Sequence, residues 1–441
     1  MTEGKLSKQI LFFSLPLVLS NVLQVLFNMA DVAVVGKFAG AASLGSVGST
    51  TTLVVLFTGF LMGIGSGVNA LTALFLGANQ KNRVKECVNT SFLISLILGI
   101  FVFLICFFGS KGFLLLLNTK QELIDKAVLY VRIYFLGIPA LSLFNFGNGV
   151  YSAIGNTKKP LMILSFSGIL NVILNLVFVI CFKLDVAGVA IASVISQYLS
   201  AFLIVGSLIK ADEIYGLRIK DIKLNREIAI RILKLSLPAG CQNAIFQIAN
   251  LFIQASVNSF DAFVVEGNSA AANADSLIYT VMASFYTACT SFMSQNYGAK
   301  IKDRIIKSYY ISLAYSFFAG LILGLLLLAF GKSFLLIFVS EEKVINAGLK
   351  RISVMALSYG VSAFMDCTIA ASRGLGRTGI PTIIVILGSC VFRVIWVYTV
   401  FAHFHTIESL YLLYVFSWSI TAIFEILYFA GEFKKVKREI A

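Results

Sequence analysis

Residues 10–36 read ILFFSLPLVLSNVLQVLFNMADVAVVG, and this stretch decides the fold class. It is long enough to cross a bilayer as one helix, because the hydrocarbon core needs roughly 20 residues. Four polar residues interrupt it at spacings of three and four and therefore share one helical face. They are Asn21, Gln24, Asn28 and Asp31. The amides could serve only to hold neighbouring helices together, whereas a carboxylate in a membrane span needs a partner, a cation or water.

The composition extends this interpretation to the whole chain. Of the 441 residues, 59% are hydrophobic and 13% are charged, whereas about a quarter of a soluble protein is charged. The pattern predicts an all-α polytopic membrane protein with twelve transmembrane helices. The expected spans are 10–36, 46–76, 88–109, 123–151, 160–182, 186–209, 232–258, 270–297, 305–330, 343–371, 380–402 and 408–430.

The net charge of +14 is best explained by membrane orientation. With a cytoplasmic N-terminus, 24 of the 35 Lys and Arg residues fall on inner segments, and ten, including Lys350 and Arg351, fall on outer segments. Arg393 lies within a span. The positive-inside rule then places both termini in the cytoplasm of a multi-pass protein of the plasma or inner membrane. We therefore expect the lipid bilayer as a partner and no nucleic acid.

Signals for covalent chemistry are missing from the sequence. The seven cysteines show no CxxC spacing, and no HExxH, GxSxG, P-loop or GxGxxG motif occurs. We expect a protein that is not an enzyme and that needs no cofactor.

An internal repeat organises the chain into two halves. The stretch ILFFSLPLVLSNVLQVLFN returns as ILKLSLPAGCQNAIFQIAN, so that Pro16 matches Pro238 and Asn28 matches Asn250 at an offset of 222. Six expected spans separate the copies, and an even number makes the repeat parallel, as in many transporters. The predicted domains are an N-lobe (1–209), a cytoplasmic linker (210–231), a C-lobe (232–430) and a cytoplasmic tail (431–441).

With these residues in view, the chain resembles the multidrug and toxic compound extrusion (MATE) transporters over nearly its whole length. The matching segments are LPLVLSNVLQ with Asp31 in the first span, SQNYGAK (294–300), SAIGNTKKP (152–160), SRGLGRTGIP (372–381) and SCVFRVIWVYTVF (389–401). The resemblance implies a V-shaped pair of pseudo-symmetric six-helix lobes that exchanges a drug-like molecule for Na⁺ or H⁺.

The resemblance also implies a cation-coupling site in the N-lobe, built from Asp31, Asn171, Asn175 and Ser193. The family often has Asp at the position of Asn175 and Thr at that of Ser193. One carboxylate with neutral oxygen ligands suits Na⁺, and Asp31 would then be a metal ligand, but the same group suits a proton equally well.

The C-lobe does not repeat this site, because Ile253 stands where the first half has Asp31. We expect a substrate cavity lined by polar and aromatic residues of the first, seventh and eighth spans. They are Asn21, Gln24, Asn28, Gln247, Asn250, Asp275, Tyr279, Met282 and Tyr286. We also expect the buried Arg393 to form a structural ion pair with Asp366 or Glu425, since a buried arginine needs a carboxylate neighbour.

The sequence thus predicts a secondary active multidrug efflux transporter that exports amphipathic or cationic compounds by alternating access, as a monomer. Flexible Met and flat aromatic side chains suit such a site, with cation–π contact assisting. One alternative is a lipid-linked oligosaccharide flippase of the same superfamily, although such carriers often have two further spans. The other is a membrane scaffold or receptor that transports nothing, which leaves the buried acids unexplained.

Overall fold

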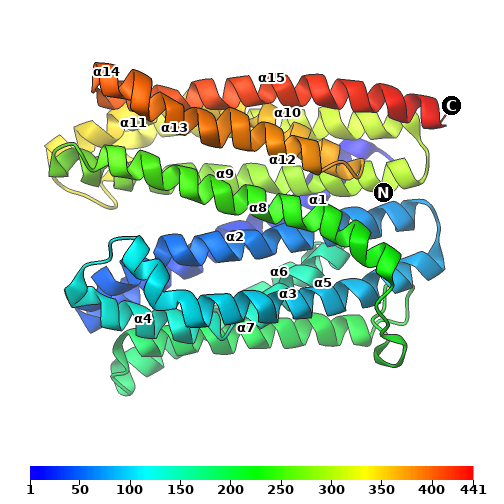
Figure 1. Ribbon diagram of the computed structural model, residues 1–441, viewed down its shortest axis with the longest axis horizontal. Helices are drawn as coiled ribbons and strands as arrows, with labels where there is room; N and C mark the ends of the chain where they lie inside the picture. The colour runs from blue at the N-terminus through cyan, green and yellow to red at the C-terminus, as the bar shows by residue number, and fades with distance from the viewer. Residues whose placement is uncertain (441) are drawn as a thin grey trace. The chain divides into compact units, whose positions relative to one another are not determined.

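The computed structural model describes residues 1–440, and these residues form helices and connecting segments without a strand (Figure 1). The α-helices are α1 (Leu6–Val34), α2 (Ala41–Gly77), α3 (Lys81–Leu116), α4 (Gln121–Phe135), α5 (Ile138–Ala153), α6 (Lys158–Leu176), α7 (Asp185–Ile209), α8 (Arg226–Val257), α9 (Ala262–Gly298), α10 (Lys302–Leu335), α11 (Glu342–Gly374), α12 (Gly379–Val385), α13 (Phe392–Trp396), α14 (Ala402–Phe404) and α15 (Ile407–Ile440). Four π-helical segments (Val35–Ala39, Val177–Cys181, Ile386–Val391 and Val397–Phe401) and one 3₁₀ turn (Ile219–Asp221) complete them.

Each of the twelve expected spans coincides with a helix or a chain of helices, which confirms the all-α polytopic class. Within the described residues, nine helices are individually long and apolar enough to cross a membrane, and the bent pair α4–α5 makes a tenth span. The seventh and eighth expected spans are α8 and α9, which are 32 and 37 residues long but less apolar. The amides of α8 and the polar residues in the first half of α9 account for this difference.

The fourth expected span is broken where the sequence places Gly137 and Pro139. Helices α4 and α5 meet there at a bend of 44°. Pro139 lies in the first turn of α5, where its missing N–H costs nothing but where its ring prevents α4 from continuing unbroken.

The described chain divides into two compact units. Unit 1 contains Met1–Val18 and Ile245–Ala441, and unit 2 contains Leu19–Ala244. The chain passes between the units inside α1 and again inside α8. The predicted lobes instead assign each of these helices whole to one lobe, and those boundaries stay a prediction based on the repeat.

Unit 2 is held together by close approach of small residues. A Cβ atom on Gly149 of α5 would lie 2.4 Å from the carbonyl oxygen of Gly65 of α2, so only glycine allows this contact. Elsewhere on α2, a Cβ atom on Gly63 would lie 2.3 Å from the backbone nitrogen of Gly240, near the middle of α8. Helices in lipid gain stability mainly by such tight packing.

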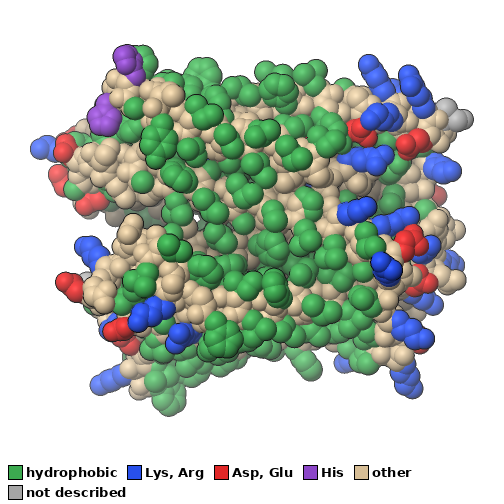
Figure 2. Space-filling model, viewed as in Figure 1, with side chains coloured by type: hydrophobic (Ala, Val, Ile, Leu, Met, Phe, Trp, Pro, Cys, Tyr) green, Lys and Arg blue, Asp and Glu red, His purple; other side chains and the backbone are tan. Residues whose placement is uncertain are grey.

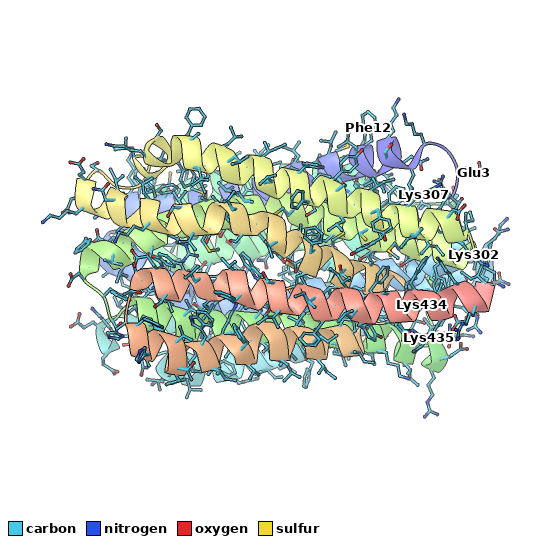
Figure 3. The ribbon with its side chains drawn as sticks, turned by 90° about the horizontal axis from the view of Figure 1, so that it is seen from above. Glu3, Phe12, Lys302, Lys307, Lys434 and Lys435 are labelled. Atoms are coloured by element: carbon cyan, nitrogen blue, oxygen red, sulfur yellow. The ribbon has the colours of Figure 1, made fainter. Side chains whose placement is uncertain are left out.

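Unit 1 is built around α9, α10, α11 and α15, whose buried side chains form one hydrophobic cluster. Its first residues are held by Arg304 of α10, which donates hydrogen bonds to the carbonyl oxygens of Met1, Glu3 and Gly4 at 2.9, 3.2 and 2.8 Å. Figure 3 shows Glu3, Lys302, Lys307, Lys434 and Lys435 at the same end of this unit.

The surface of each unit is divided by residue type along the helices. Hydrophobic side chains cover the middle of the face seen in Figure 2, and charged side chains gather at the two ends. This is the distribution of a protein whose middle faces lipid and whose ends face water. The protein is a multi-pass membrane protein.

Candidate functional site

The four residues expected at the cation-coupling site lie together in unit 2. Asp31 of α1 accepts a hydrogen bond from Asn175 Nδ2 of α6 at 2.5 Å on one carboxylate oxygen. Its other oxygen accepts a hydrogen bond from Ser193 Oγ of α7 at 3.4 Å. The successive helices α6 and α7 therefore meet the distant helix α1 at one carboxylate.

The neutral residues are also bonded to one another. Asn175 Nδ2 lies 3.3 Å from Asn171 Oδ1, and Asn171 Nδ2 donates to Ser193 Oγ at 3.4 Å. Asn171 and Asn175 face the carboxylate together because they are one helical turn apart. Asn175 is fully buried, and its Oδ1 has no hydrogen-bond donor among the described residues. A buried carbonyl oxygen without a donor, beside a carboxylate, is an arrangement that a cation would complete.

Two π-helical segments border this cluster. Val35–Ala39 begins four residues after Asp31, and Val177–Cys181 begins two residues after Asn175. The two segments contact each other. Extra residues inserted into α-helices in this way occur frequently at functional sites.

Two tyrosines near Asp31 were not foreseen from the sequence. Tyr130 and Tyr134 of α4 are buried or half-buried, their rings stack at 6.0 Å, and the charge of Asp31 acts on both. Their spacing of four residues in the fourth span was the available signal, because it places both rings on one helical face.

Asp31 is the residue of the α1 polar stripe that is bonded to α6 and α7. Asn21 and Gln24 are half-buried and Asn28 is exposed, and the bonding partners of Asp31 come from α6 and α7. Their expected place in a substrate cavity stays a prediction.

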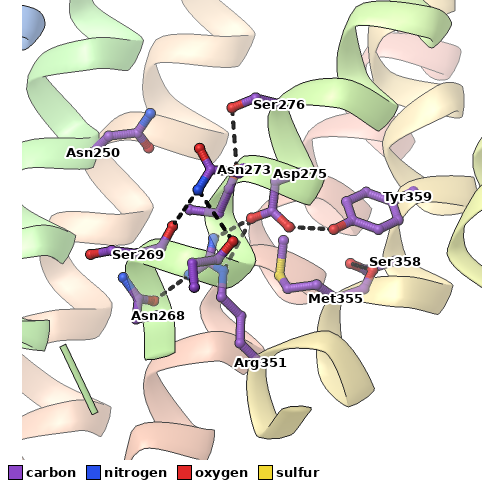
Figure 4. Close-up of polar contacts among 12 residues, drawn as sticks. Asn250, Asn268, Ser269, Asn273, Asp275, Ser276, Arg351, Met355, Ser358 and Tyr359 are labelled. Atoms are coloured by element: carbon purple, nitrogen blue, oxygen red, sulfur yellow. Dashed lines mark hydrogen bonds and ion pairs between the residues drawn. The ribbon is translucent and has the colours of Figure 1, made fainter. Parts of the chain in front are cut away.

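Asp275 is bonded to an arginine and a tyrosine of α11 (Figure 4). It accepts hydrogen bonds from Arg351 Nε at 3.1 Å, from Arg351 Nη2 and from the hydroxyl of Tyr359, and its expected place in the substrate cavity stays a prediction. Arg351 Nη1 also donates to Asn268 Oδ1 at 2.7 Å. The Asp275 and Arg351 side chains are only 21% and 7% exposed, so this is a largely buried ion pair.

Arg351 is the residue that sequence reasoning misplaced, since it was counted with the outer segments. It lies inside the tenth expected span, ten residues into α11. The available signal was that Asp275 and Arg351 lie at similar distances from the outer ends of the eighth and tenth spans.

The other residues expected beside Asp275 lie in unit 1 in three different environments. Met282 is fully buried in the hydrophobic cluster, Tyr286 is buried, and Tyr279 is half exposed. The rings of Tyr279 and Tyr286 lie 6.3 Å apart. The acid whose charge acts on both tyrosines is Asp366. Gln247 and Asn250 of α8 are half-buried.

The expected ion pair of Arg393 with Asp366 or Glu425 does not form within 4.0 Å among residues 1–440. Arg393 instead donates to Ser417 Oγ at 3.2 Å and to Asn250 Oδ1 at 3.1 Å. Glu425 is completely buried, and neither of its carboxylate oxygens has a hydrogen-bond donor in the described chain. The physical reason is distance along α15, because Ser417, which meets Arg393, lies two turns from Glu425.

A family comparison explains the internal repeat. The MatE family model matches residues 16–177 and, a second time at the same offset as the sequence repeat, residues 238–399. The chain belongs to the MatE family. The double match confirms two copies of one MatE unit in a single chain.

Individual relatives agree with this assignment. The probable multidrug resistance protein YpnP of Bacillus subtilis (strain 168) is 29% identical over 377 residues, which cover 85% of this chain and 84% of YpnP. Two solved structures share the MatE fold at 22% identity. An outward-facing multidrug resistance MATE family transporter of the MOP superfamily matches with a TM-score of 0.90, covering 99% of this chain and 97% of its own. A MOP superfamily transporter from Pyrococcus furiosus, described as having a binding pocket of reverse polarity, matches with a TM-score of 0.92. The match covers 98% of this chain and 97% of that transporter.

Proposed function

We propose that this protein exports amphipathic organic compounds across the cell membrane and that entry of Na⁺ or H⁺ at the Asp31 site drives the export. MatE family membership and the name of the Bacillus relative, a probable multidrug resistance protein, support transport of small molecules. The observation that carries the coupling proposal is the buried Asn175 Oδ1, which has no donor and belongs to the residue that bonds the Asp31 carboxylate.

The charge of the site suits a monovalent cation. Asp31 supplies one negative charge, and Asn171, Asn175 and Ser193 supply neutral oxygen atoms, which are the ligands that hard cations prefer. A cation can drive a conformational change only by binding one state more tightly than another. Neutralising Asp31 therefore removes the difference in affinity on which coupling depends.

Substitutions at the site would distinguish Na⁺ from H⁺, because the two ions need different numbers of protein ligands. Sodium would be bound by several oxygens, so Asn171→Ala and Asn175→Ala should each weaken the dependence on Na⁺. A proton would need the carboxylate alone, and the same variants should leave proton-driven export in place.

The expected preference for cationic compounds loses one support, because Arg351 already neutralises Asp275. Asp366, with Tyr279 and Tyr286 beside it, is the remaining acid that a cationic compound could use. The flippase and the scaffold alternatives have no separate observation in their favour.

We further propose that one chain is the transport unit and that both termini are cytoplasmic. The basic residues at the end of unit 1 that contains Glu3 and Lys434 support this orientation (Figure 3).

The test is dye export from proteoliposomes under an imposed Na⁺ or pH gradient. Asp31→Asn should give folded protein that has lost gradient-driven export, and Asp31→Glu should keep part of it. Ser193→Ala should weaken coupling. Ser196→Ala is a matched control because, among residues 1–440, Ser196 Oγ donates to the carbonyl of Ala192 in its own helix, at 2.8 Å, and not to Asp31. Full gradient-driven export by folded Asp31→Asn protein would refute the proposal.

A further inference from the structure

Arg393 of α13 is buried between two aromatic rings and two neutral hydrogen-bond acceptors. Only 1% of its surface is exposed. Its guanidinium lies 4.6 Å from the ring centre of Phe246 and 4.7 Å from that of Tyr414. Its hydrogen bonds go to Ser417 Oγ and Asn250 Oδ1, which are both neutral acceptors. These contacts orient the guanidinium plane without supplying a negative charge.

No carboxylate of the described residues is bonded to the guanidinium of Arg393. Nη2 is buried and has no hydrogen-bond acceptor among the described residues. Asp366 acts on it through its charge but forms no ion pair within 4.0 Å, and Arg373 acts on the same carboxylate more strongly. A buried charge that lacks a counter-charge is costly.

Arg351 provides an internal comparison in the same unit. Its guanidinium lies 5.4 Å from the same Tyr414 ring, and an aspartate bonds it through two nitrogens. The two arginines share an aromatic neighbour but differ in the acid. Arg393 therefore has the setting of a paired arginine without its carboxylate.

We propose that Arg393 binds the acidic group of the transported compound, so that the substrates include amphipathic organic compounds carrying a carboxylate or phosphate. The inference rests on the proposed transport function and specifies its substrate class. The guanidinium presents donors in a planar fork that matches a carboxylate or phosphate. Phe246 and Tyr414, both half-buried, provide flat surfaces for the apolar body of the compound. Asn250 is also half-buried, and its amide nitrogen adds a further donor for the anion.

The chain contains a built-in reporter for this binding. Its two tryptophans are Trp396 and Trp418. Trp396 follows Arg393 by three residues, and Trp418 follows Ser417 and packs against Tyr414 at 5.6 Å between ring centres. A compound that binds Arg393 should therefore change the intrinsic tryptophan fluorescence.

The experiment uses the purified full chain in a non-ionic detergent without any gradient. The probes are para-pentylbenzoate and the matched neutral para-pentylbenzamide, titrated while tryptophan fluorescence is recorded. A hydrogen bond to a charged group is stronger than one to a neutral group, so the benzoate should bind at least about tenfold more tightly than the benzamide. Equal affinity of the wild-type protein for the two probes would overturn the proposal.

The variants separate Arg393 from charge effects elsewhere. Arg393→Gln should remove the preference for the benzoate, and Arg393→Lys should keep part of it. Arg132→Gln is the matched control, because Arg132 also bonds a serine and lies 5.7 Å from a phenylalanine ring, but in unit 2. An unchanged preference in Arg393→Gln would refute the assignment. If Arg393→Gln does not fold, the comparison is made with Arg393→Lys, where an undiminished preference would also count against it.

The binding measurement is independent of ion coupling. Asp31→Asn should keep the benzoate preference even where it abolishes gradient-driven export. Loss of coupling with intact binding would therefore contradict only the Asp31 proposal, and intact coupling without a benzoate preference would contradict only the Arg393 proposal.

Discussion

Replacing Asp275 by Asn should destabilise the protein strongly, although the residue lies in the half of the chain without the proposed cation site. The substitution removes the negative charge that accepts two hydrogen bonds from Arg351 and one from Tyr359. Breaking a buried ion pair from one side costs about 3–5 kcal/mol, because the remaining charge is left buried. Asp275 keeps 21% of its side chain exposed, so we expect the lower end, about 3 kcal/mol. That corresponds to roughly a hundredfold change in the unfolding equilibrium.

The assay is thermal unfolding of the purified variants, followed by size-exclusion chromatography. The double variant Asp275→Asn/Arg351→Gln should recover part of the loss, because neither charge is then unpaired. The adjacent pair of Lys350 with Glu408, at 3.0 Å, is the control, since its side chains are 60% and 48% exposed. Glu408→Gln should lower the free energy of unfolding by less than about 1 kcal/mol. Equal stability of Asp275→Asn and Glu408→Gln would refute the reasoning.

Two other substitutions test the packing of each unit. Arg304→Gln should release the first residues of unit 1, because it removes the bonds to three of their carbonyl oxygens, and trypsin should then cleave faster after Lys5 than in the wild type. Gly63→Ala should cost about 1–3 kcal/mol of stability, since its Cβ would lie 2.3 Å from the backbone nitrogen of Gly240. Gly48→Ala on the same helix has open space around its Cβ and should be neutral or slightly stabilising, so equal thermal stability of these two glycine variants would contradict the close approach.

The Asp31 site could be predicted because its members follow from two kinds of information that the sequence holds. Helical periodicity places Asn171 and Asn175 on one face, and the resemblance to the MATE transporters pairs that face with Asp31 and Ser193. The structure brings the four together as expected. Tyr130 and Tyr134 were missed because their spacing places both rings on one helical face but does not show that this face turns toward the first span.

The arginine pairings could not be predicted, for a related reason. A sequence gives the approximate depth of a charged residue in the membrane, but the choice of partner depends on which helices are neighbours. Helices α9 and α11 pack against each other in unit 1, and Asp275 therefore forms its ion pair with Arg351. Arg393 faces α8 and the first third of α15, where Asn250 and Ser417 are the available acceptors.

The π-helical segments beside the Asp31 cluster contain extra backbone residues that a regular α-helix would not hold. Each segment accommodates a residue more than an α-helical turn would hold. Returning one of them to α-helical hydrogen bonding would turn the following residues by about 100° and move them by about 1.5 Å along the axis. A cation bound at the proposed Asp31 site would therefore lie next to a segment where a whole helix end can rotate while it keeps nearly all of its backbone hydrogen bonds.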